Sequence, residues 1–399
     1  MDLDRTSQQT RNIYQFFLIT GVILIAFNLR PAITSVGPLI STIREDLGLT
    51  NSSVGLLTSL PLIAFAIMSP IAPKLGNRYS NERAMVIGLI LLLIGISIRS
   101  MSIIFLLFTG TLLIGLGIAI LNVLLPSLIK DKFPNRIGVM TSVYSTAMGV
   151  IAATASGLSV PLASVMNLGW QFALFIWATP AILAIIPVYY LSRKAHSEHH
   201  VESRFIRSDQ QMWKSPLAWQ VALFMGTQSF LFYVTISWLP AILHDYGASM
   251  TIAGWLLSFT QFIGLPASFI VPVVAERMQS QRVLVIVMGL CSILGYGGLL
   301  IGQSTASMII SIILIGIALS GTFALALTFL GLRTKTARQA AELSGMAQTF
   351  GYILAAVGPI LIGFLFDVSQ TWTIPLLTIL GISLVVMLFG IGAGRNKNV

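Results

Sequence analysis

The sequence predicts an all-α integral membrane protein whose twelve transmembrane helices form two six-helix halves. Three observations support this fold class. Hydrophobic residues make up 56% of the 399 residues and charged residues only 9%, whereas a soluble domain carries about 25% charged residues. Apolar stretches long enough to cross a bilayer recur along the whole chain. The second half of the chain also repeats features of the first half at a constant offset.

Twelve apolar runs supply the predicted spans. A helix needs about 20 predominantly apolar residues to cross the hydrocarbon core, and the chain is long enough for twelve such helices joined by short loops. The predicted spans are residues 14–40, 52–72, 84–98, 103–129, 138–163, 171–191, 217–240, 251–273, 283–301, 307–330, 342–365 and 372–393. An even number of spans puts both termini on the same side of the membrane.

The first run contains one charge, Arg30, in the stretch Phe27-Asn28-Leu29-Arg30-Pro31. A cation inside a membrane costs between about 2.5 and more than 10 kcal/mol, so this side chain should face a water-filled cavity or a partner. Pro31 can open the local helix because it lacks a backbone N–H. Two roles follow for Arg30: contact with an anionic or polarised solute, or a brace between helices through backbone carbonyls.

The basic residues indicate the orientation, because cytoplasmic loops are enriched in Lys and Arg. With the amino terminus in the cytoplasm, 20 of the 23 basic residues lie on the cytoplasmic side, and only Arg44 and Arg99 fall in outer loops. The cytoplasmic set is Arg5, Arg11, Lys74, Arg78, Arg83, Lys130, Lys132, Arg136, Arg193, Lys194, Arg204, Arg207, Lys214, Arg277, Arg282, Arg333, Lys335, Arg338, Arg395 and Lys397. The sequence therefore predicts a multi-pass plasma-membrane protein with both termini in the cytoplasm.

The longest polar stretch separates six spans from six. The resulting parts are an amino-terminal half at 1–191, a cytoplasmic linker at 192–216 and a carboxyl-terminal half at 217–399. His196, His199 and His200 in the linker have helical spacing. A solvated linker is the favoured interpretation of these histidines, over a metal site.

Matching residues recur 199 positions apart in the two halves. The pairs are Gly55 and Gly254, Ser69 and Ser268, Pro73 and Pro272, Arg78 and Arg277, and Arg83 and Arg282. They put the same turn and basic residues after the second and the eighth span. Parallel repeats of six spans are characteristic of the major facilitator fold, in which the solute binds between the halves near the middle of the membrane.

The loop after the second span resembles the signature loop of that superfamily, Gly-x-x-x-Asp-Arg-x-Gly followed by basic residues. Here Pro73 and Ser80 replace the glycines and Asn77 replaces the aspartate. The resemblance implies gating residues at Asn77, Arg78, Arg83, Glu276 and Arg277. Glu276 can pair with Arg277 or another nearby base. A basic loop that only sets the topology is the alternative.

Several longer stretches resemble one branch of the superfamily. They are residues 28–38, Asn122-Val123-Leu124-Leu125-Pro126 with Lys130 and Phe133-Pro134, Phe232-Tyr233, Trp238-Leu239-Pro240-Ala241-Ile242-Leu243, Met346-Ala347-Gln348, Gly351-Tyr352 and Gly358-Pro359. Over essentially the whole chain, this pattern is similar to the cyanate and nitroimidazole transporter (CynX/NimT) family. The resemblance implies a secondary transporter that works by alternating access on a small anion such as cyanate or on a polar nitroheterocycle.

Polar side chains inside the spans are candidates for the solute pathway, because amides and phenols form hydrogen bonds without the desolvation cost of a charge. The resemblance implies that the first, fourth, seventh and tenth spans line the cavity, flanked by the second, fifth, eighth and eleventh. With Arg30, the predicted solute-binding residues are Asn28, Asn122, Tyr144, Gln228, Gln261, Gln348 and Tyr352. Hydrogen bonds between packed spans are the alternative role for each of them.

Other functional classes find little support in the sequence. It contains no phosphate-binding loop, no His-Glu-x-x-His pair and a single cysteine, Cys291, so it predicts no enzyme, no cofactor and no metal site. The net charge of +10 lies in the loops between spans. We therefore expect a monomer whose partners are the lipid bilayer and a small-molecule solute, and no nucleic acid. An uncoupled, channel-like facilitator and a membrane ligand sensor remain alternatives to a coupled transporter.

Overall fold

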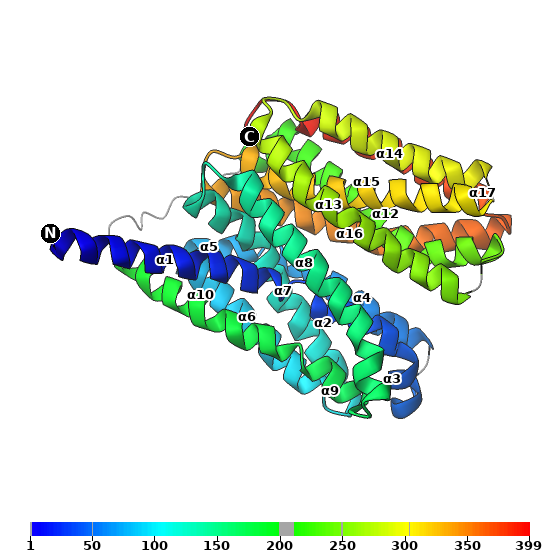
Figure 1. Cartoon of the computed structure of the whole chain (residues 1–399), viewed down its shortest axis with the longest axis horizontal. Coiled ribbons are helices and arrows are strands. Elements are labelled where there is room, and N and C mark those ends of the chain that lie inside the picture. The colour runs from blue at the N-terminus through cyan, green and yellow to red at the C-terminus, as the bar shows by residue number, and fades with distance from the viewer. Residues whose placement is uncertain (1, 50, 199–210, 249, 303) are drawn as a thin grey trace. The chain divides into compact units, whose positions relative to one another are not determined.

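The computed structural model of the protein describes residues 2–49, 51–198, 211–248, 250–302 and 304–399. In these residues the chain forms helices and no strands (Figure 1). Within these described ranges, eleven helical stretches are long and apolar enough to cross a membrane, and the bent pair Ser59–Met68 and Ala72–Tyr79 supplies a twelfth span. The predicted all-α membrane fold with twelve spans is confirmed.

The amino-terminal spans are built from helices of unequal length. In chain order they are α1 (Asp2–Ala26), α2 (Pro31–Thr34), η1 (Gly37–Leu39), α3 (Ile40–Leu47), α4 (Asn51–Met68), α5 (Ala72–Tyr79), α6 (Asn81–Arg99), α7 (Ile104–Lys132), α8 (Ile137–Val160), η2 (Pro161–Val165), α9 (Gly169–Phe175) and α10 (Ala178–Glu198). The second span bends by 50° between α4 and α5. Pro70 and Pro73 flank this bend, where a missing N–H interrupts the helical hydrogen bonds.

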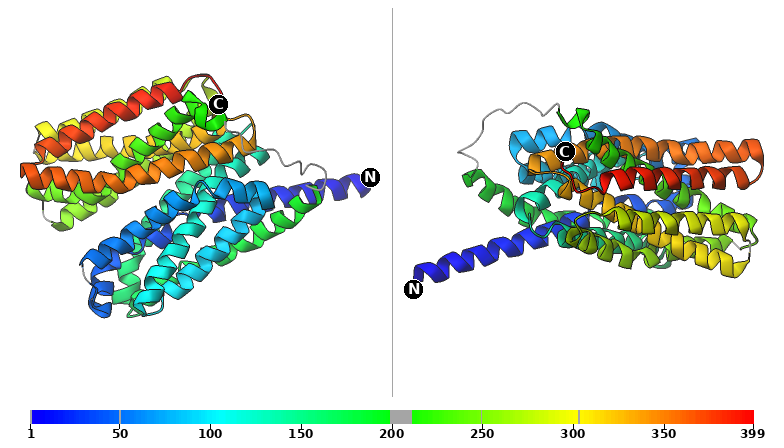
Figure 2. Two further views of the ribbon diagram at one scale, coloured as in Figure 1. Left: turned by 180° about the vertical axis from the view of Figure 1, so that it is seen from behind. Right: turned by 90° about the horizontal axis from the view of Figure 1, so that it is seen from above.

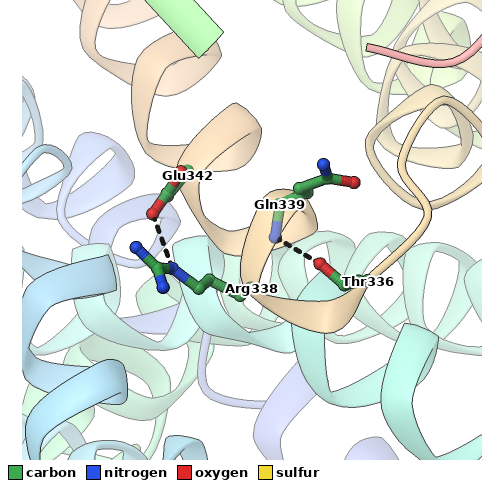
Figure 3. Close-up of polar contacts among 4 residues, drawn as sticks. All are labelled: Thr336, Arg338, Gln339 and Glu342. Carbon is green, nitrogen blue, oxygen red and sulfur yellow. Dashed lines mark hydrogen bonds and ion pairs between the residues drawn. The ribbon is translucent and has the colours of Figure 1, made fainter. Parts of the chain in front are cut away.

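Each carboxyl-terminal span is a single unbroken helix. They are α11 (Gln211–Lys214), which precedes the first of these spans, α12 (Pro216–Asp245), α13 (Met250–Arg277), α14 (Arg282–Ile301), α15 (Thr305–Leu332), α16 (Ala337–Ser369) and α17 (Thr373–Ala393). Polar caps define where some of them begin. The Thr336 hydroxyl accepts a bond from Gln339 N at 3.2 Å, and Arg338 Nε donates to Glu342 Oε1 at 3.1 Å (Figure 3). This cap starts α16 more than one turn before the predicted span.

The chain forms two compact units. Unit 1 comprises Met1–Leu128 and Val150–Asp209, and unit 2 comprises Ile129–Gly149 and Gln210–Val399. The first half of α8 thus belongs to unit 2, although it precedes the polar linker in the sequence. The division into halves on either side of that linker stays a prediction. His196 lies in α10, whereas His199 and His200 lie outside the described residues.

Glycines let α6 and α7 approach closely in unit 1. A Cβ at Gly95 would lie 2.7 Å from the Gly110 carbonyl oxygen, and a Cβ at Gly117 would lie 2.5 Å from the Gly88 oxygen. Small residues allow this contact between membrane helices, where lipid provides no hydrophobic driving force. Helix α10 packs against both α1 and α6 (Figure 2).

In unit 2, α12 packs against α16 and α17, while α15 packs against α13 and α14 (Figure 1). Phe224 of α12 and Phe329 of α15 are fully buried, and their ring centroids lie 5.7 Å apart. These helices provide the packed scaffold on which the polar residues of this unit lie.

Each unit contains the same contact between an aspartate and an indole. In unit 1, Trp170 Nε1 donates to Asp46 Oδ2 at 2.8 Å. In unit 2, Trp372 Nε1 donates to Asp245 Oδ2 at 2.6 Å. The two aspartates are 199 positions apart, which is the offset of the sequence repeat. We call these contacts the indole clasps. In unit 2, burial and then the neighbouring Asp245 carboxylate raise the pKa of the Tyr246 phenol.

Candidate functional site

The first span is interrupted at the Arg-Pro step, as the sequence predicts. Helix α1 ends at Ala26 and α2 begins at Pro31. Between them, Asn28 N donates to Ile25 O at 2.9 Å, in the tighter i−3 pattern. Arg30 is the residue before α2, with φ −132° and ψ −34°. Its side chain is half-buried, so a cationic group lies at an opened helix end.

Asn28 lies in the same break and is buried. Its Nδ2 donates to Leu24 O at 2.7 Å, one turn back. Its Oδ1 has no hydrogen-bond partner among the described residues. Buried polar atoms are nearly always satisfied by protein or water, so this acceptor is available for a donor that enters the break. Asn122, the third predicted residue of unit 1, is half-buried in α7.

The other predicted solute-binding residues belong to unit 2. Gln228 is buried in α12, and its Nε2 donates to Leu319 O of α15 at 3.5 Å. Gln348 is buried in α16, and its Nε2 donates to Ser344 Oγ at 3.0 Å. These bonds correspond to the packing role that the sequence analysis kept as an alternative.

Three residues complete the predicted set in unit 2. Gln261 and Tyr352 are half-buried in α13 and α16. Tyr144 lies in the part of α8 that belongs to unit 2 and has 2% of its surface exposed. The Tyr144 hydroxyl has no hydrogen-bond partner among the described residues. Three of the predicted solute-binding residues thus lie in unit 1 and five lie in unit 2.

The predicted gating residues of unit 1 lie at the turn from α5 to α6. Asn77 and Arg78 are exposed, and the Arg78 guanidinium lies 5.3 Å from the centroid of the Tyr79 ring. Ser80 has a positive φ of 83° and accepts a bond from Arg83 N at 3.3 Å, so it caps α6. The basic loop is thus a compact connection between two helices.

Glu276 binds a backbone N–H group and not the basic side chain that was predicted. Its Oε2 accepts a bond at 3.2 Å from Val139 N in the first turn of α8. That turn carries N–H groups without helical acceptors and the positive end of the helix dipole. Within the described part of the chain, Glu276 takes part in no ion pair. Arg277 is exposed. Pairing of Glu276 with a base is therefore corrected to capping of α8.

Beyond this cap, α8 and α13 share a line of hydrogen bonds inside unit 2. Ser142 Oγ donates to Phe269 O at 2.6 Å, and Ser145 Oγ donates to Ser268 O at 3.2 Å. The Ser268 carbonyl needs an outside donor because Pro272, four residues later, has no N–H to offer it. We call this contact the α8–α13 seam. It consists of Gly138, Val139, Ser142, Ser145 and Thr146 of α8 and Ser268, Phe269, Pro272 and Glu276 of α13.

The charge pattern of the sequence puts Arg99 in an outer loop, and this is wrong. Arg99 is the last residue of α6 and has 1% of its surface exposed. Its Nη1 donates to Ala32 O, in the broken first span, at 2.6 Å. An arginine at the end of an apolar run resembles an interface residue, so the sequence carries no signal of its burial. Arg44, the other expected loop residue, lies in α3 and is half-buried.

Comparison with known proteins places these features in a family. The family model of the Major Facilitator Superfamily matches residues 16–359 and 232–396. The uncharacterized transporter YycB of Bacillus subtilis (strain 168) is 49% identical over 387 residues, which cover 97% of this chain and 96% of that protein. The 2-nitroimidazole transporter of Escherichia coli (strain K12) is 41% identical over 96% of each chain. The cyanate transport protein CynX of the same organism is 27% identical, over 93% of this chain and 97% of its own length.

Solved structures share the fold at low sequence identity. The proton:xylose symporter XylE, bound to 6-bromo-6-deoxy-D-glucose, has a TM-score of 0.75 and 15% identity, over 96% of each chain. The transporter FucP in the outward conformation has a TM-score of 0.71 and 14% identity, over 94% of this chain and 97% of that one. Together, the family match, the two functionally named relatives and the shared fold show that this multi-pass membrane protein is a small-solute transporter of the major facilitator superfamily, in its CynX/NimT-like branch.

Proposed function

We propose that the protein is a secondary-active transporter of the plasma membrane that moves a small polar or anionic solute by alternating access. The observation that carries the proposal is the interrupted first span, which holds Arg30 at an opened helix end beside the buried amide of Asn28. An ionisable residue inside a span is costly to bury and is by default a candidate for a solute or ion pathway. Arg30 is then the central charged contact for the solute.

The relatives indicate the chemistry of the solute. One is named for 2-nitroimidazole and another for cyanate. A nitro group presents two coplanar oxygens, which a guanidinium can bind through two parallel N–H donors, and cyanate carries a full negative charge. Both suit Arg30. The buried Asn28 amide in the same break would then orient the solute by hydrogen bonds, and Gln228, Gln348 and Tyr144 of unit 2 stay predicted solute contacts.

The α8–α13 seam supports the alternating-access part of the proposal. Its contacts are hydroxyl-to-carbonyl bonds and one carboxylate cap, each worth about 1 kcal/mol net. Such contacts can part and re-form without exposing a large apolar surface. In this proposal the protein acts as a monomer with both termini in the cytoplasm. Glu276, Arg277 and the Asn77, Arg78 and Arg83 loop control the exchange between states.

Transport by the purified chain in liposomes tests the proposal. Uptake of radiolabelled cyanate and of 2-nitroimidazole would be measured with and without an imposed proton gradient, and empty liposomes serve as the control. Accumulation above the electrochemical equilibrium of the solute indicates a coupled transporter, whereas uptake that stops at equilibrium indicates the uncoupled facilitator. Binding without flux would indicate a ligand sensor. Absence of both binding and flux for either compound would overturn the proposed solute class.

A further inference from the structure

The carbonyl of Ala32 depends on Arg99 for its hydrogen bond. In a regular helix Val36 N would donate to Ala32 O, but here it donates to Ile33 O at 3.2 Å. Arg99 Nη1 fills the vacant position at 2.6 Å, and both residues are buried. A buried carbonyl left without a donor costs about 1–3 kcal/mol. Arg99 therefore stabilises this particular backbone geometry after the break.

Helix α2 is a single turn, so contacts with its surroundings must fix its direction. It contains only Pro31–Thr34, and so short a helix has no stability of its own in isolation. At the end of α2, Thr34 Oγ1 lies 3.2 Å from Ala152 O of α8 and 3.3 Å from Arg30 O. Arg30 O also accepts bonds from Ile33 N and Thr34 N. A tilt of α2 would thus move the backbone of Arg30 with it.

The backbone of Arg99 is held in place by close packing against α7. A Cβ at Gly110 of α7 would lie 2.7 Å from both Arg99 N and Arg99 Cβ. The two helices touch here through their backbones, so the start of the Arg99 side chain has little freedom to shift.

Packing alone does not account for an arginine at this position. Among the described residues Arg99 forms no ion pair, and its Nε and Nη2 have no hydrogen-bond partner there. Burying a charge without a counter-charge costs several kcal/mol, and apolar side chains of similar size replace such groups without loss of stability. A residue that only filled space would be better served by methionine.

We propose that Arg99 is a positioning residue for the solute site. Its hydrogen bond to the Ala32 carbonyl fixes the orientation of α2, and this orientation determines where the Arg30 side chain points. The inference rests on the proposed role of Arg30 in solute binding. It assigns no solute contact to Arg99 itself.

A double-mutant cycle on the full chain tests this role. Dissociation constants for cyanate and for 2-nitroimidazole would be measured for Arg99→Met, Arg99→Lys, Arg30→Ala and the Arg30→Ala/Arg99→Met double variant. We expect Arg99→Met to weaken binding about tenfold, which corresponds to about 1.4 kcal/mol of lost hydrogen bonding. Arg99→Lys, which keeps a charged donor, should stay within about threefold of the wild type. The double variant should bind no more weakly than Arg30→Ala alone, because Arg99 acts through Arg30.

Ser97→Ala is the matched control, since Ser97 lies in the same turn of α6 and its hydroxyl bonds within that helix. Its affinity should equal that of the wild type. Wild-type affinity in Arg99→Met, or a further loss in the double variant, would overturn the proposal. If Arg99→Met does not fold, Arg99→Gln is tested by the same criteria in its place.

A wrong solute class can be distinguished from a wrong role for Arg99. If the wild type binds neither probe, the solute class is wrong, and hydrogen exchange of the amides of residues 33–36 decides on Arg99. Faster exchange in Arg99→Met than in Ser97→Ala supports the hold on α2. Equal rates overturn it.

Discussion

Arg30 lies in the interruption of the first span, where the helix is open. Its charge should dominate the affinity for an anionic or nitro-bearing solute. Removing one member of a buried charge pair costs about 3–5 kcal/mol. We therefore expect Arg30→Ala to weaken binding by about two orders of magnitude or more, and Arg30→Lys to retain part of the affinity because it keeps the charge without the planar fork. Equilibrium binding to the purified variants measures both.

The exposed Lys335 provides the control for Arg30, since it lies in the connection before α16. Lys335→Ala should leave binding unchanged. Near-native affinity in a folded Arg30→Ala variant would identify Arg30 as a brace between helices and contradict its role as the central contact.

Individual residues also mark the limit of prediction from the sequence. The break at Arg30-Pro31 was predictable because a proline disfavours a continuous helix there. The burial of Arg99 was not, since it depends on how closely Gly95 and Gly110 bring α6 and α7 together. The role of Glu276 was missed because its partner is a backbone N–H at a helix start, which leaves no side-chain signature.

At the level of the elements, the α8–α13 seam should influence which conformation the protein occupies. A carboxylate at a helix amino end contributes about 0.3–1 kcal/mol. Glu276→Ala should therefore reduce the population in which the seam is closed, while solute affinity changes less than about twofold. Spin labels would be attached at Asn135→Cys and Gln279→Cys in a Cys291→Ser background. We expect the distribution of distances between the two labels to shift toward longer values in Glu276→Ala.

Glu342→Ala is the control for the seam, because it removes a carboxylate of unit 2 that pairs with Arg338 one turn away. Its distance distribution should match that of the wild type. A large loss of affinity in Glu276→Ala with unchanged distances would assign Glu276 to the solute site and refute a gating role.

The two indole clasps are a second prediction at this level. Each joins an aspartate to a tryptophan more than a hundred positions away, so no local sequence pattern could predict them. Hydrogen bonds to charged groups are worth about 1.5–3 kcal/mol. Trp170→Phe and Trp372→Phe should each lower the apparent melting temperature by a few degrees, and the double variant by their sum, because the clasps lie in separate units.

Differential scanning fluorimetry in detergent measures these shifts. Trp255→Phe serves as the control, since that side chain is 74% exposed and its loss should have no effect. Unchanged melting in both clasp variants would show that these bonds add nothing to the stability of the units.

For the whole molecule, the charge distribution predicts which ends of the helices face the cytoplasm. Lys335 and Thr371 are exposed and flank α16, which is long enough to span the membrane. In a Cys291→Ser background, Thr371→Cys should react with an impermeant maleimide in intact cells. Lys335→Cys should react only after the cells are made permeable. Labelling of Lys335→Cys from outside would invert the proposed orientation.

The twelve spans and the family were accessible from the sequence because both are spread over the whole chain. Apolar runs and repeated residues at one offset average over many positions, so single misjudged residues do not alter the result. The candidate site was less accessible. Gln228 and Gln348 are amides of the kind expected to contact a solute, yet they donate hydrogen bonds to a neighbouring backbone carbonyl and to a serine hydroxyl, and only the packing of the helices determines these partners.

Pro272 has a consequence for what happens when α8 and α13 separate. Because this proline lacks an N–H, the Ser268 carbonyl has no donor four residues later in its own helix and accepts a bond from the Ser145 hydroxyl of the other helix. Separation of the seam removes the Ser145 donor from this oxygen, and a water molecule can take its place. Hydration of this position would accompany each opening, so osmolytes that lower the activity of water should slow turnover even where they leave solute affinity intact.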